Sequence, residues 1–344
     1  MRRGAAVTVI WFLIRRLAAA IPTVVLLSLV TFLIIQAPPG DYADSLRTQL
    51  INQGGASAAE AEAQAARFRA ENGLNDPLLV QYARWAGGIV TRGDFGFSYA
   101  ANRPVADIVG ERLWPTLLLA LTSHLLATAI GIALGVLAAT RAGRWTDAAL
   151  NLFAFVGMTT PRFLLALIAL YVLVFQFDLA QVGSFQSAAY VGAPWSWGKF
   201  ADLVAHVWPA ILIAAWGGIA YSMRVMRGNL LDVLNAQYVE TARAKGLSPA
   251  RVIWRHAVPN ALHPLVAHQG VALPYMVTGE IEVAIVFGLA TVGPAIVGAM
   301  AVGDVFVAAT FMLVLAVTLI IGNILADLGL ALLDPRIRLE GRKS

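Results

Sequence analysis

The stretch Tyr238-Val-Glu-Thr-Ala-Arg-Ala-Lys-Gly-Leu-Ser-Pro-Ala-Arg-Val-Ile-Trp-Arg-His-Ala-Val-Pro-Asn-Ala-Leu262 is a polar, basic segment in an otherwise apolar chain. Four residues at four-residue spacing are predicted to share one helical face: Leu230, Leu234, Tyr238 and Ala242. Gly246 can adopt the left-handed backbone that ends a helix. Ser248 suits the N-cap and Pro249 the first position of a second helix, because the first turn leaves its N–H groups unpaired anyway. We expect this second helix to run to about Val258, since Pro259 interferes with its continuation.

This hairpin is either a solvated loop between two membrane helices or a docking surface for another protein. The order Glu240-Thr241-Ala242, with Gly246 four residues after Ala242, resembles the EAA loop of ABC-importer permeases. The family pattern is Glu-Ala-Ala, three variable residues and Gly, so Thr241 replaces the middle alanine. In that family the loop forms a coupling helix that sits in a groove of a separate ATPase subunit.

The resemblance implies that a loop at about residues 228–262 couples this chain to an ATPase. Glu240 would either pair with a basic residue of the ATPase or cap the hairpin locally. Gly246 would be needed for its backbone conformation rather than for a contact. The implied coupling residues are Tyr238, Glu240, Thr241, Ala242, Lys245, Gly246, Leu247, Ser248 and Arg251.

The composition excludes several classes of protein. Of the 344 residues 59% are hydrophobic and only 13% are charged, which is too apolar for a soluble globular domain. The net charge of +5 does not indicate nucleic-acid binding, because the basic residues lie beside apolar spans, where they act as topology signals. With no Cys and with five His that show no metal-ligand spacing, we expect neither a disulfide nor a metal site.

Six apolar spans of about the length that a bilayer-crossing helix needs follow one another along the chain. They cover about residues 17–35, 113–139, 149–175, 209–226, 264–283 and 305–330. Lys and Arg concentrate in the short segments on one side of these spans, which predicts that both termini are cytoplasmic. The predicted fold is therefore all-α integral membrane, with six transmembrane helices. A cleaved signal peptide is the alternative for the first span, but that apolar run is long for one.

Four regions are predicted along the chain: the cytoplasmic N-terminus with the first helix (1–36), an outer segment (37–112), the membrane core (113–333) and a basic cytoplasmic tail (334–344). The outer segment is the one long hydrophilic part, and its Ala/Glu-rich stretch from Ala58 to Ala70 is predicted to be helical. It forms either a small outer domain or an ordinary connector.

The resemblance covers nearly the whole chain and is to the B-type permease subunit of dipeptide/oligopeptide importers. It implies a type I ABC importer permease core in the bacterial inner membrane, forming half of the translocation path. It also implies a second, usually non-identical permease, two cytoplasmic ATPases and an external solute-binding protein. The motifs that carry it are Leu13–Leu17, Ala37–Asp41, Pro77–Trp85, Gly93–Ser98, Glu111–Thr116, Gly279–Phe287 and Leu333–Arg338.

ATP chemistry is expected in another chain. The sequence contains no Gly-x-x-x-x-Gly-Lys-[Ser/Thr] loop that could hold nucleotide phosphates. No cofactor is therefore expected on this chain, ATP and Mg²⁺ are assigned to the partner ATPases, and the chain is not expected to be an enzyme.

Polar residues inside the predicted spans are candidates for a translocation path, namely Thr159, Thr160, Gln269, Glu280 and Glu282. Ionisable groups within a bilayer are costly and indicate function, unless the span ends early and both glutamates are simply hydrated. The Thr and Gln side chains serve helix packing equally well. Arg162 lies inside the third span and is explained only if the helix breaks at Pro161.

The predicted function is ATP-driven import, with di- or oligopeptides as the leading cargo and alternating access as the mechanism. Nickel chelates, glutathione, opines and sugars remain open as cargo, because pore-lining residues cannot be assigned from the sequence. An ATPase-independent secondary transporter is the alternative class; it should contain inverted repeats and broken helices, and no clear repeat is visible.

Overall fold

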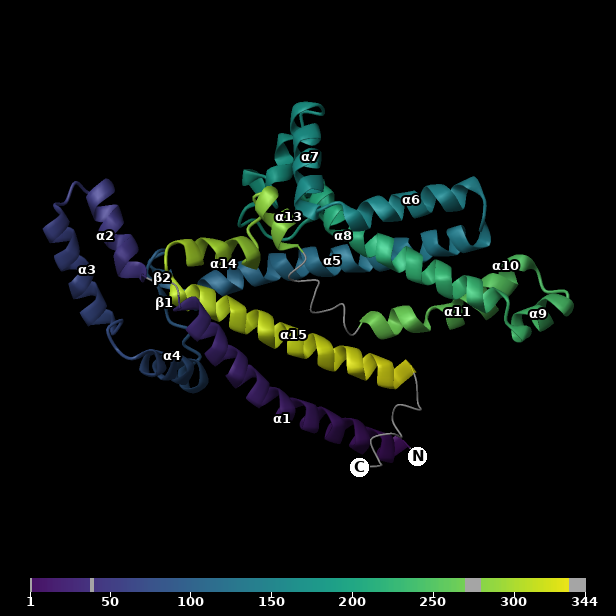
Figure 1. The fold of residues 1–344 in the computed structure, drawn as a ribbon, viewed down its shortest axis with the longest axis horizontal. Helices are drawn as coiled ribbons and strands as arrows, with labels where there is room; N and C mark the ends of the chain where they lie inside the picture. Colours follow the sequence, from purple (N-terminus) through teal and green to yellow (C-terminus); the bar gives the residue numbers. More distant parts are fainter. Residues whose placement is uncertain (1, 38–39, 270–279, 334–344) are drawn as a thin grey trace. The chain divides into compact units, whose positions relative to one another are not determined.

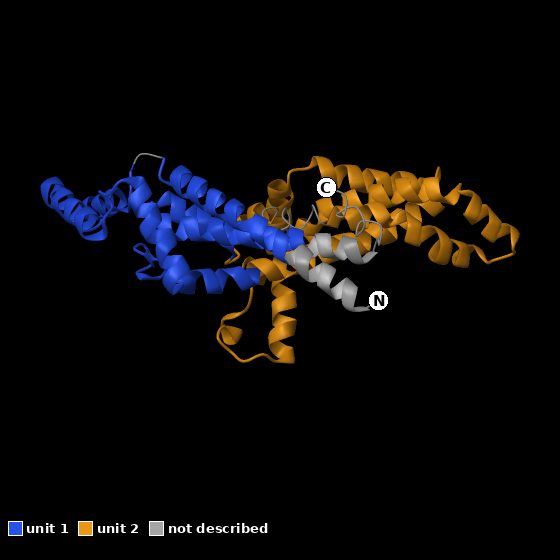
Figure 2. Cartoon of the chain, turned by 90° about the horizontal axis from the view of Figure 1, so that it is seen from below, with its two compact units in different colours: residues 1–115, 291–324 blue, residues 116–290, 325–344 orange. Residues whose placement is uncertain are grey.

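The computed structural model describes residues 2–37, 40–269 and 280–333, and within these ranges the side chains of residues 14–324. The described chain is almost entirely helical. It forms two compact units, of residues 1–115 with 291–324 (unit 1) and residues 116–290 with 325–344 (unit 2) (Figure 2).

Unit 1 combines two long apolar helices with a small outer segment (Figure 1). Phe32 of α1 stacks on Trp85 of α4, with ring centroids 5.5 Å apart, and both pack with Ala309 of α15. The elements of unit 1 are α1 (Arg2–Ile35), α2 (Tyr42–Asn52), α3 (Ala58–Asn72), α4 (Leu78–Arg92), the antiparallel pair β1 (Phe97–Ser98) and β2 (Arg103–Pro104), the start of α5 (Val105–Thr140), α14 (Val292–Ala301) and α15 (Val305–Leu333). Unit 1 contains α15 up to residue 324.

The outer segment is a folded group of helices rather than an extended connector. The predicted helix at Ala58 to Ala70 is confirmed as α3, and capping boxes begin both α2 and α3. In the first, Asp41 and Asp44 each accept a hydrogen bond from the other's backbone N–H. The structure adds the short apolar helix α14 between the fifth and sixth predicted spans.

Unit 2 contains the rest of α5 and the helices that follow it. Figure 1 shows α6 running beside α8, in agreement with their extensive packing. The elements are α6 (Trp145–Thr159), α7 (Arg162–Phe175), two short 3₁₀ turns (Ala180–Gly183 and Ala188–Tyr190), α8 (Trp197–Leu234), α9 (Gln237–Ala244), α10 (Pro249–Arg251), the π turn η3 (Val252–Ala257), α11 (Val258–Ala261) and α13 (Ile281–Val286). Helix α8 begins at Trp197, well before the predicted start near 209.

Small residues bring α5 and α8 close together. A Cβ added to Gly131 would lie 2.9 Å from the carbonyl oxygen of Ile219, and one added to Gly135 would lie 2.7 Å from that of Met223. Glycines four residues apart lie on the same face of a helix and allow two backbones to approach. In a bilayer, where burial of apolar surface does not drive association, such van der Waals contact holds helices together.

Among the described residues four helices are long and apolar enough to cross a membrane: Ile14–Ile35, Val105–Thr140, Trp197–Leu234 and Val305–Ile324. The pair α6 and α7 makes a fifth span if it is counted as one, although the two helices are bent by 105°. Half of the predicted fifth span at about 264–283, namely residues 270–279, lies outside the described residues. The count of six and the orientation of the termini thus stay predictions.

Candidate functional site

The hairpin after α8 differs in one respect from the sequence-based prediction. Helix α8 ends at Leu234, and the backbone turns at Asn235 and Ala236 before α9 begins. Tyr238 is therefore 45% exposed while Ala242 is buried, so the prediction that both continue the helical face of Leu230 is wrong. Because α8 ends at Leu234, the four-residue spacing no longer places the later residues on the same helical face.

Gly246 ends α9 as predicted. Its φ is +74°, in the left-handed region, and Leu247 donates its backbone N–H to the carbonyl of Ala242. A Cβ on Gly246 would meet no atom within 4 Å, so the constraint at this position is conformational rather than steric. Ser248 is the N-cap of α10 with Pro249 in its first turn, although the serine side chain makes no capping hydrogen bond.

The second arm of the hairpin does not end before Pro259. It continues from α10 through the π turn η3 into α11, which runs to Ala261. Within this turn the N–H of Val258 donates to the carbonyl of Ile253, five residues earlier. A π turn widens the helix, and this relieves the clash between a proline ring and the carbonyl four residues before it.

The hairpin is packed firmly onto unit 2 by its apolar side. Val239 and Ala242 of α9, and Val252 of η3, join one buried cluster with Met226 and Leu230 of α8. Residues of α5 complete the cluster. The hairpin therefore shares one apolar core with the two longest helices of this unit.

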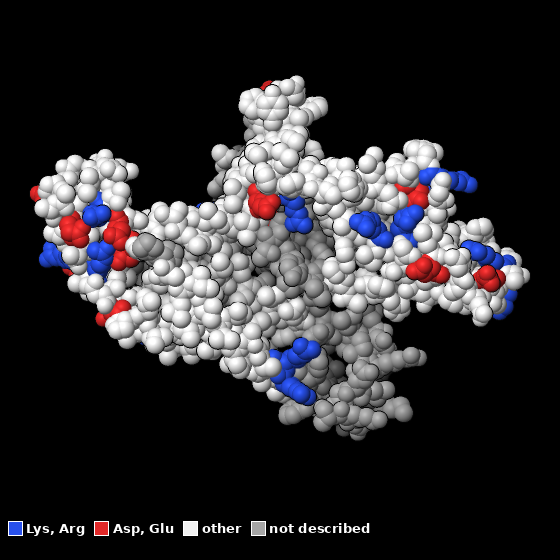
Figure 3. Space-filling view, viewed as in Figure 1, with Lys and Arg blue, Asp and Glu red and all other residues white. Residues whose placement is uncertain are grey.

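The other side of the hairpin is polar and exposed. Figure 3 shows Lys and Arg side chains gathered at the end of unit 2 that carries α9 and α10. The carboxylate of Glu240 makes no hydrogen bond or ion pair with another described residue, so it does not cap the hairpin locally. Of the nine predicted coupling residues only Ala242 is buried and Leu247 is half-buried, and the exposed ones are Tyr238, Glu240, Thr241, Lys245, Gly246, Ser248 and Arg251.

A second site lies where α6 gives way to α7. Thr160 and Pro161 have extended backbones, and the chain turns sharply there. The break explains Arg162, which begins α7 instead of interrupting an apolar helix. A cavity of about 470 Å³ opens at this point. Its lining residues come from α6, α7, α8, α13 and the break itself, and they include Thr160, Arg162, Gly217 and Glu282.

The remaining predicted path residues do not gather at this cavity. Thr159 is exposed and donates its hydroxyl to the carbonyl of Phe155. Gln269 contacts His124 of α5 and donates to the carbonyl of Leu265, a helix-packing role. Glu280 is 2% exposed, and its carboxyl oxygens have no hydrogen-bond partner among the described residues. Of the five candidates, Thr160 and Glu282 line the cavity at the break.

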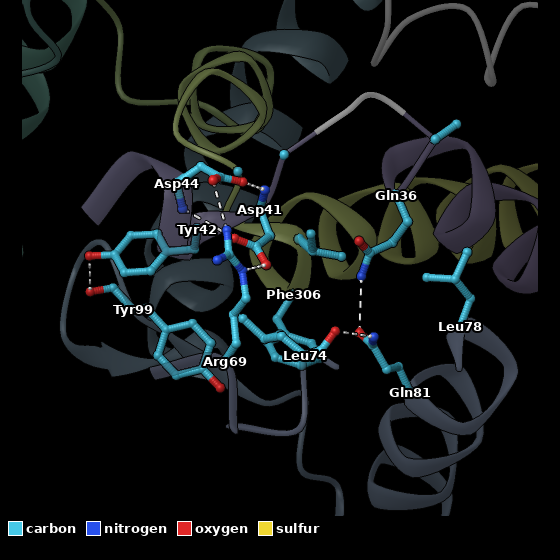
Figure 4. A pocket seen from close by; sticks show the side chains of 14 residues that line it. Gln36, Asp41, Tyr42, Asp44, Arg69, Leu74, Leu78, Gln81, Tyr99 and Phe306 are labelled. Atoms are coloured by element: carbon cyan, nitrogen blue, oxygen red, sulfur yellow. Dashed lines mark hydrogen bonds and ion pairs between the residues drawn. The ribbon is translucent and has the colours of Figure 1, made fainter. Parts of the chain in front are cut away.

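Unit 1 has a cavity of its own, of about 460 Å³, in the outer segment (Figure 4). Arg69 of α3 donates to the carboxylates of Asp41 and Asp44 at 2.9 and 2.7 Å. On the other side Gln36 donates to Gln81, which is held in turn by backbone carbonyls of Leu74 and Asp76. These polar groups largely satisfy one another, so they are best explained as the connections that hold the outer helices to the ends of α1 and α4.

The sequence-based reasoning missed one pair near the hairpin. Arg227 of α8 donates two hydrogen bonds to the carboxylate of Asp147, which is buried at the start of α6. The only local signal was an acidic residue in the first turn of a helix, which is common for electrostatic reasons alone. Among the described residues no group of three His, Asp or Glu side chains is placed to hold a metal ion.

Apolar helices, one broken span and a hairpin with a free polar face define a multi-pass membrane protein of the transport type. The chain belongs to the family of binding-protein-dependent transport system inner membrane components, whose model matches residues 131–339. The model of the N-terminal part of such membrane components matches residues 9–120. The resemblance seen in the sequence is thereby confirmed.

Two curated relatives cover almost the same length. One is the "Probable peptide ABC transporter permease protein y4tP" of Sinorhizobium fredii, 32% identical over 327 residues, which are 95% of this chain and 99% of the relative. The other is the oligopeptide transport system permease protein AppB of Bacillus subtilis, 33% identical over 327 residues, which are 95% of this chain and 98% of the relative.

Proposed function

We propose that this chain is the permease subunit of an ATP-driven importer of di- or oligopeptides. The observation that carries the proposal is the similarity along 95% of the chain to permeases named for peptide and oligopeptide transport. Six transmembrane helices, with both termini in the cytoplasm of a bacterial inner membrane, complete the proposal. The predicted regions 1–36, 37–112, 113–333 and 334–344 are part of it.

The exposed face of the hairpin is the proposed docking surface for a cytoplasmic ATPase. It combines an exposed aromatic, Tyr238, with the carboxylate of Glu240 and the cations Lys245 and Arg251. Tyr and Arg are among the residues that most often anchor protein interfaces, and complementary charges favour the right partner. Two such ATPases, a second permease of different sequence and an external solute-binding protein are the proposed partners. ATP and Mg²⁺ would bind to the ATPases.

The proposed mechanism is alternating access. Because the hairpin shares a buried cluster with α8 and α5, a displacement of its exposed face moves those helices with it. The conformational change is driven by the difference in ATP affinity between the two states of the partners. This chain supplies the lever and half of the path.

Purification from the native membrane tests this proposal. The tagged chain, extracted in mild detergent, should bring along a second permease and the ATPases, and the reconstituted complex should take up peptides only with ATP. Gly246→Val should keep the chain in the membrane but remove the ATPases, because a β-branched residue is strained at this left-handed position. Uptake of another solute class by the wild-type complex would refute the peptide assignment.

One observation favours a second function. The break between α6 and α7 is the kind of discontinuous helix that secondary transporters use to bind ions and substrates. Uptake by the purified chain alone, driven by an ion gradient and without ATP, would establish this second function in place of the first.

A further inference from the structure

The cavity at the break between α6 and α7 lies at the depth of the hydrocarbon. Arg141 and Arg144, just before α6, mark the loop that lies outside the bilayer core. From there α6 has 15 residues, which rise about 22 Å at 1.5 Å per residue, whereas the hydrocarbon is about 30 Å thick. With the predicted topology, the break and its cavity therefore fall inside the membrane.

Two opposite charges line this cavity from different helices. Arg162 begins α7 and is half-buried, and Glu282 lies in the first turn of α13 and is exposed. Helix α13 is held against α7 and α8 by Val283 and Ala284, which are fully buried, so Glu282 is fixed in place. Its carboxylate makes no hydrogen bond or ion pair with another residue in the described part of the chain.

Charged groups at this depth do not face lipid. They face a water-filled cavity or another protein, because an ion in hydrocarbon is strongly destabilised. The surface that carries Arg162 and Glu282 therefore borders either the aqueous path or the partner permease. We assign it to the aqueous path, and the experiment below separates this assignment from a contact with the partner permease.

The space beside the guanidinium is kept open by a glycine. A Cβ on Gly217 of α8 would lie 3.3 Å from Nη2 of Arg162, which is tighter than most contacts. The volume of about 470 Å³ is within the range of small-ligand sites, roughly 300–1,000 Å³. A dipeptide in extended form is about 7 Å long, so both of its ends fit in such a space.

We propose that this cavity binds a short zwitterionic peptide on its way across the membrane, with the peptide carboxylate at Arg162 and its ammonium group at Glu282. The hydroxyl of Thr160 is the polar group available to the peptide bond. Guanidinium and carboxylate groups are the matched partners for these two ends. This inference rests on the proposed function and adds a place where the cargo is recognised inside the chain.

Direct binding to the complete transporter in nanodiscs, without the solute-binding protein, tests the inference. The probe is radiolabelled Ala-Ala, with N-acetyl-Ala-Ala and Ala-Ala-amide as competitors. Each lost charge-assisted contact should weaken binding about ten- to a hundredfold. Glu282→Gln should weaken binding of Ala-Ala and leave binding of N-acetyl-Ala-Ala unchanged. Arg162→Gln should also weaken binding of Ala-Ala, but it should leave binding of Ala-Ala-amide unchanged.

Two further variants show whether a loss of binding reflects the lost charge or a misfolded chain. Gly217→Ala removes no charge but narrows the space at Arg162, and it should weaken binding of all three peptides. Glu71→Gln removes an exposed carboxylate of α3 and should leave peptide binding as in the wild type. Wild-type affinity of both charge variants for Ala-Ala would overturn the inference. Loss of the second permease from these variants would also overturn it, because the two charges would then belong to the interface between the permeases. Failure of the proposed function is a separate result, namely that the wild-type complex transports no peptide.

Discussion

Arg227 donates two hydrogen bonds to the carboxylate of Asp147, Nε to Oδ1 at 2.7 Å and Nη2 to Oδ2 at 2.8 Å. The same carboxylate accepts the backbone N–H of Gly143 and the amide of Asn151. The pair connects the start of α6 to the last third of α8, the part of that helix that precedes the hairpin in the sequence. Helix α8 thus leads into the hairpin and also carries the anchor of α6, the helix that ends at the break.

Replacing Arg227 with Gln should destabilise the chain. It leaves the buried carboxylate without its main partner, which costs about 3–5 kcal/mol for a fully buried pair. Because the Arg227 side chain is 28% exposed, we expect roughly 2–3 kcal/mol. Thermal unfolding in detergent measures the change. Arg224→Gln is the matched control, since Arg224 is exposed and, in the described part of the chain, contacts only the sulfur of Met158. An equal loss in both variants would contradict the role of the pair.

Gly246 should tolerate asparagine but not valine. At a φ of +74° a β-branched residue is strained by about 1–2 kcal/mol, whereas asparagine adopts this region readily. A Cβ at this position would have no neighbouring atom within 4 Å, so the valine and asparagine variants are expected to differ mainly in backbone preference. ATP-dependent uptake should fall in Gly246→Val and persist in Gly246→Asn. Loss in both would show that the position itself contacts the partner.

Adding one methyl group at Gly135 should disturb the packing of α5 on α8. The new Cβ would lie 2.6 Å from Cβ of Met226 and 2.7 Å from the carbonyl oxygen of Met223, neither of which is the end of a flexible side chain. Overpacking of this kind costs about 1–3 kcal/mol. Gly228→Ala, where nothing lies within 4 Å, should raise the melting temperature slightly because alanine favours the helix. A lower melting temperature of Gly228→Ala, or no change in Gly135→Ala, would contradict this account.

The outer segment should loosen in acid. The pKa of Asp44 is lowered, first by the backbone N–H of Asp41 and then by Arg69. A lowered pKa in the folded state means that the unfolded chain binds more protons, so the stabilisation is present above the unfolded pKa of about 3.9 and is lost as the pH falls through the folded pKa. The protection factors of α2 and α3 in hydrogen exchange, corrected for the intrinsic rate at each pH, should therefore fall below about pH 4. Asp44→Asn should abolish this pH dependence; if it persists in that variant, another group is responsible.

Local chemistry was enough to predict several features. The left-handed Gly246, the N-cap position of Ser248 and the helix at Ala58 to Ala70 depend on residues within one turn, and all three were predicted. Pro259 was misjudged because the π turn that accommodates it is set by packing of Val252 and Ala257 in the buried cluster, which the local sequence does not reveal.

By itself the sequence determined the family, the helical membrane class and the turn chemistry of the hairpin, because these follow from composition, hydrophobic periodicity and local backbone preferences. Tertiary structure decided which distant residues meet. Arg227 and Asp147 are 80 positions apart, and Arg162 and Glu282 come together only because α7, α8 and α13 pack on one another. Spacing along a chain predicts contacts within one helix, whereas contacts between helices depend on where the chain turns and which faces pack.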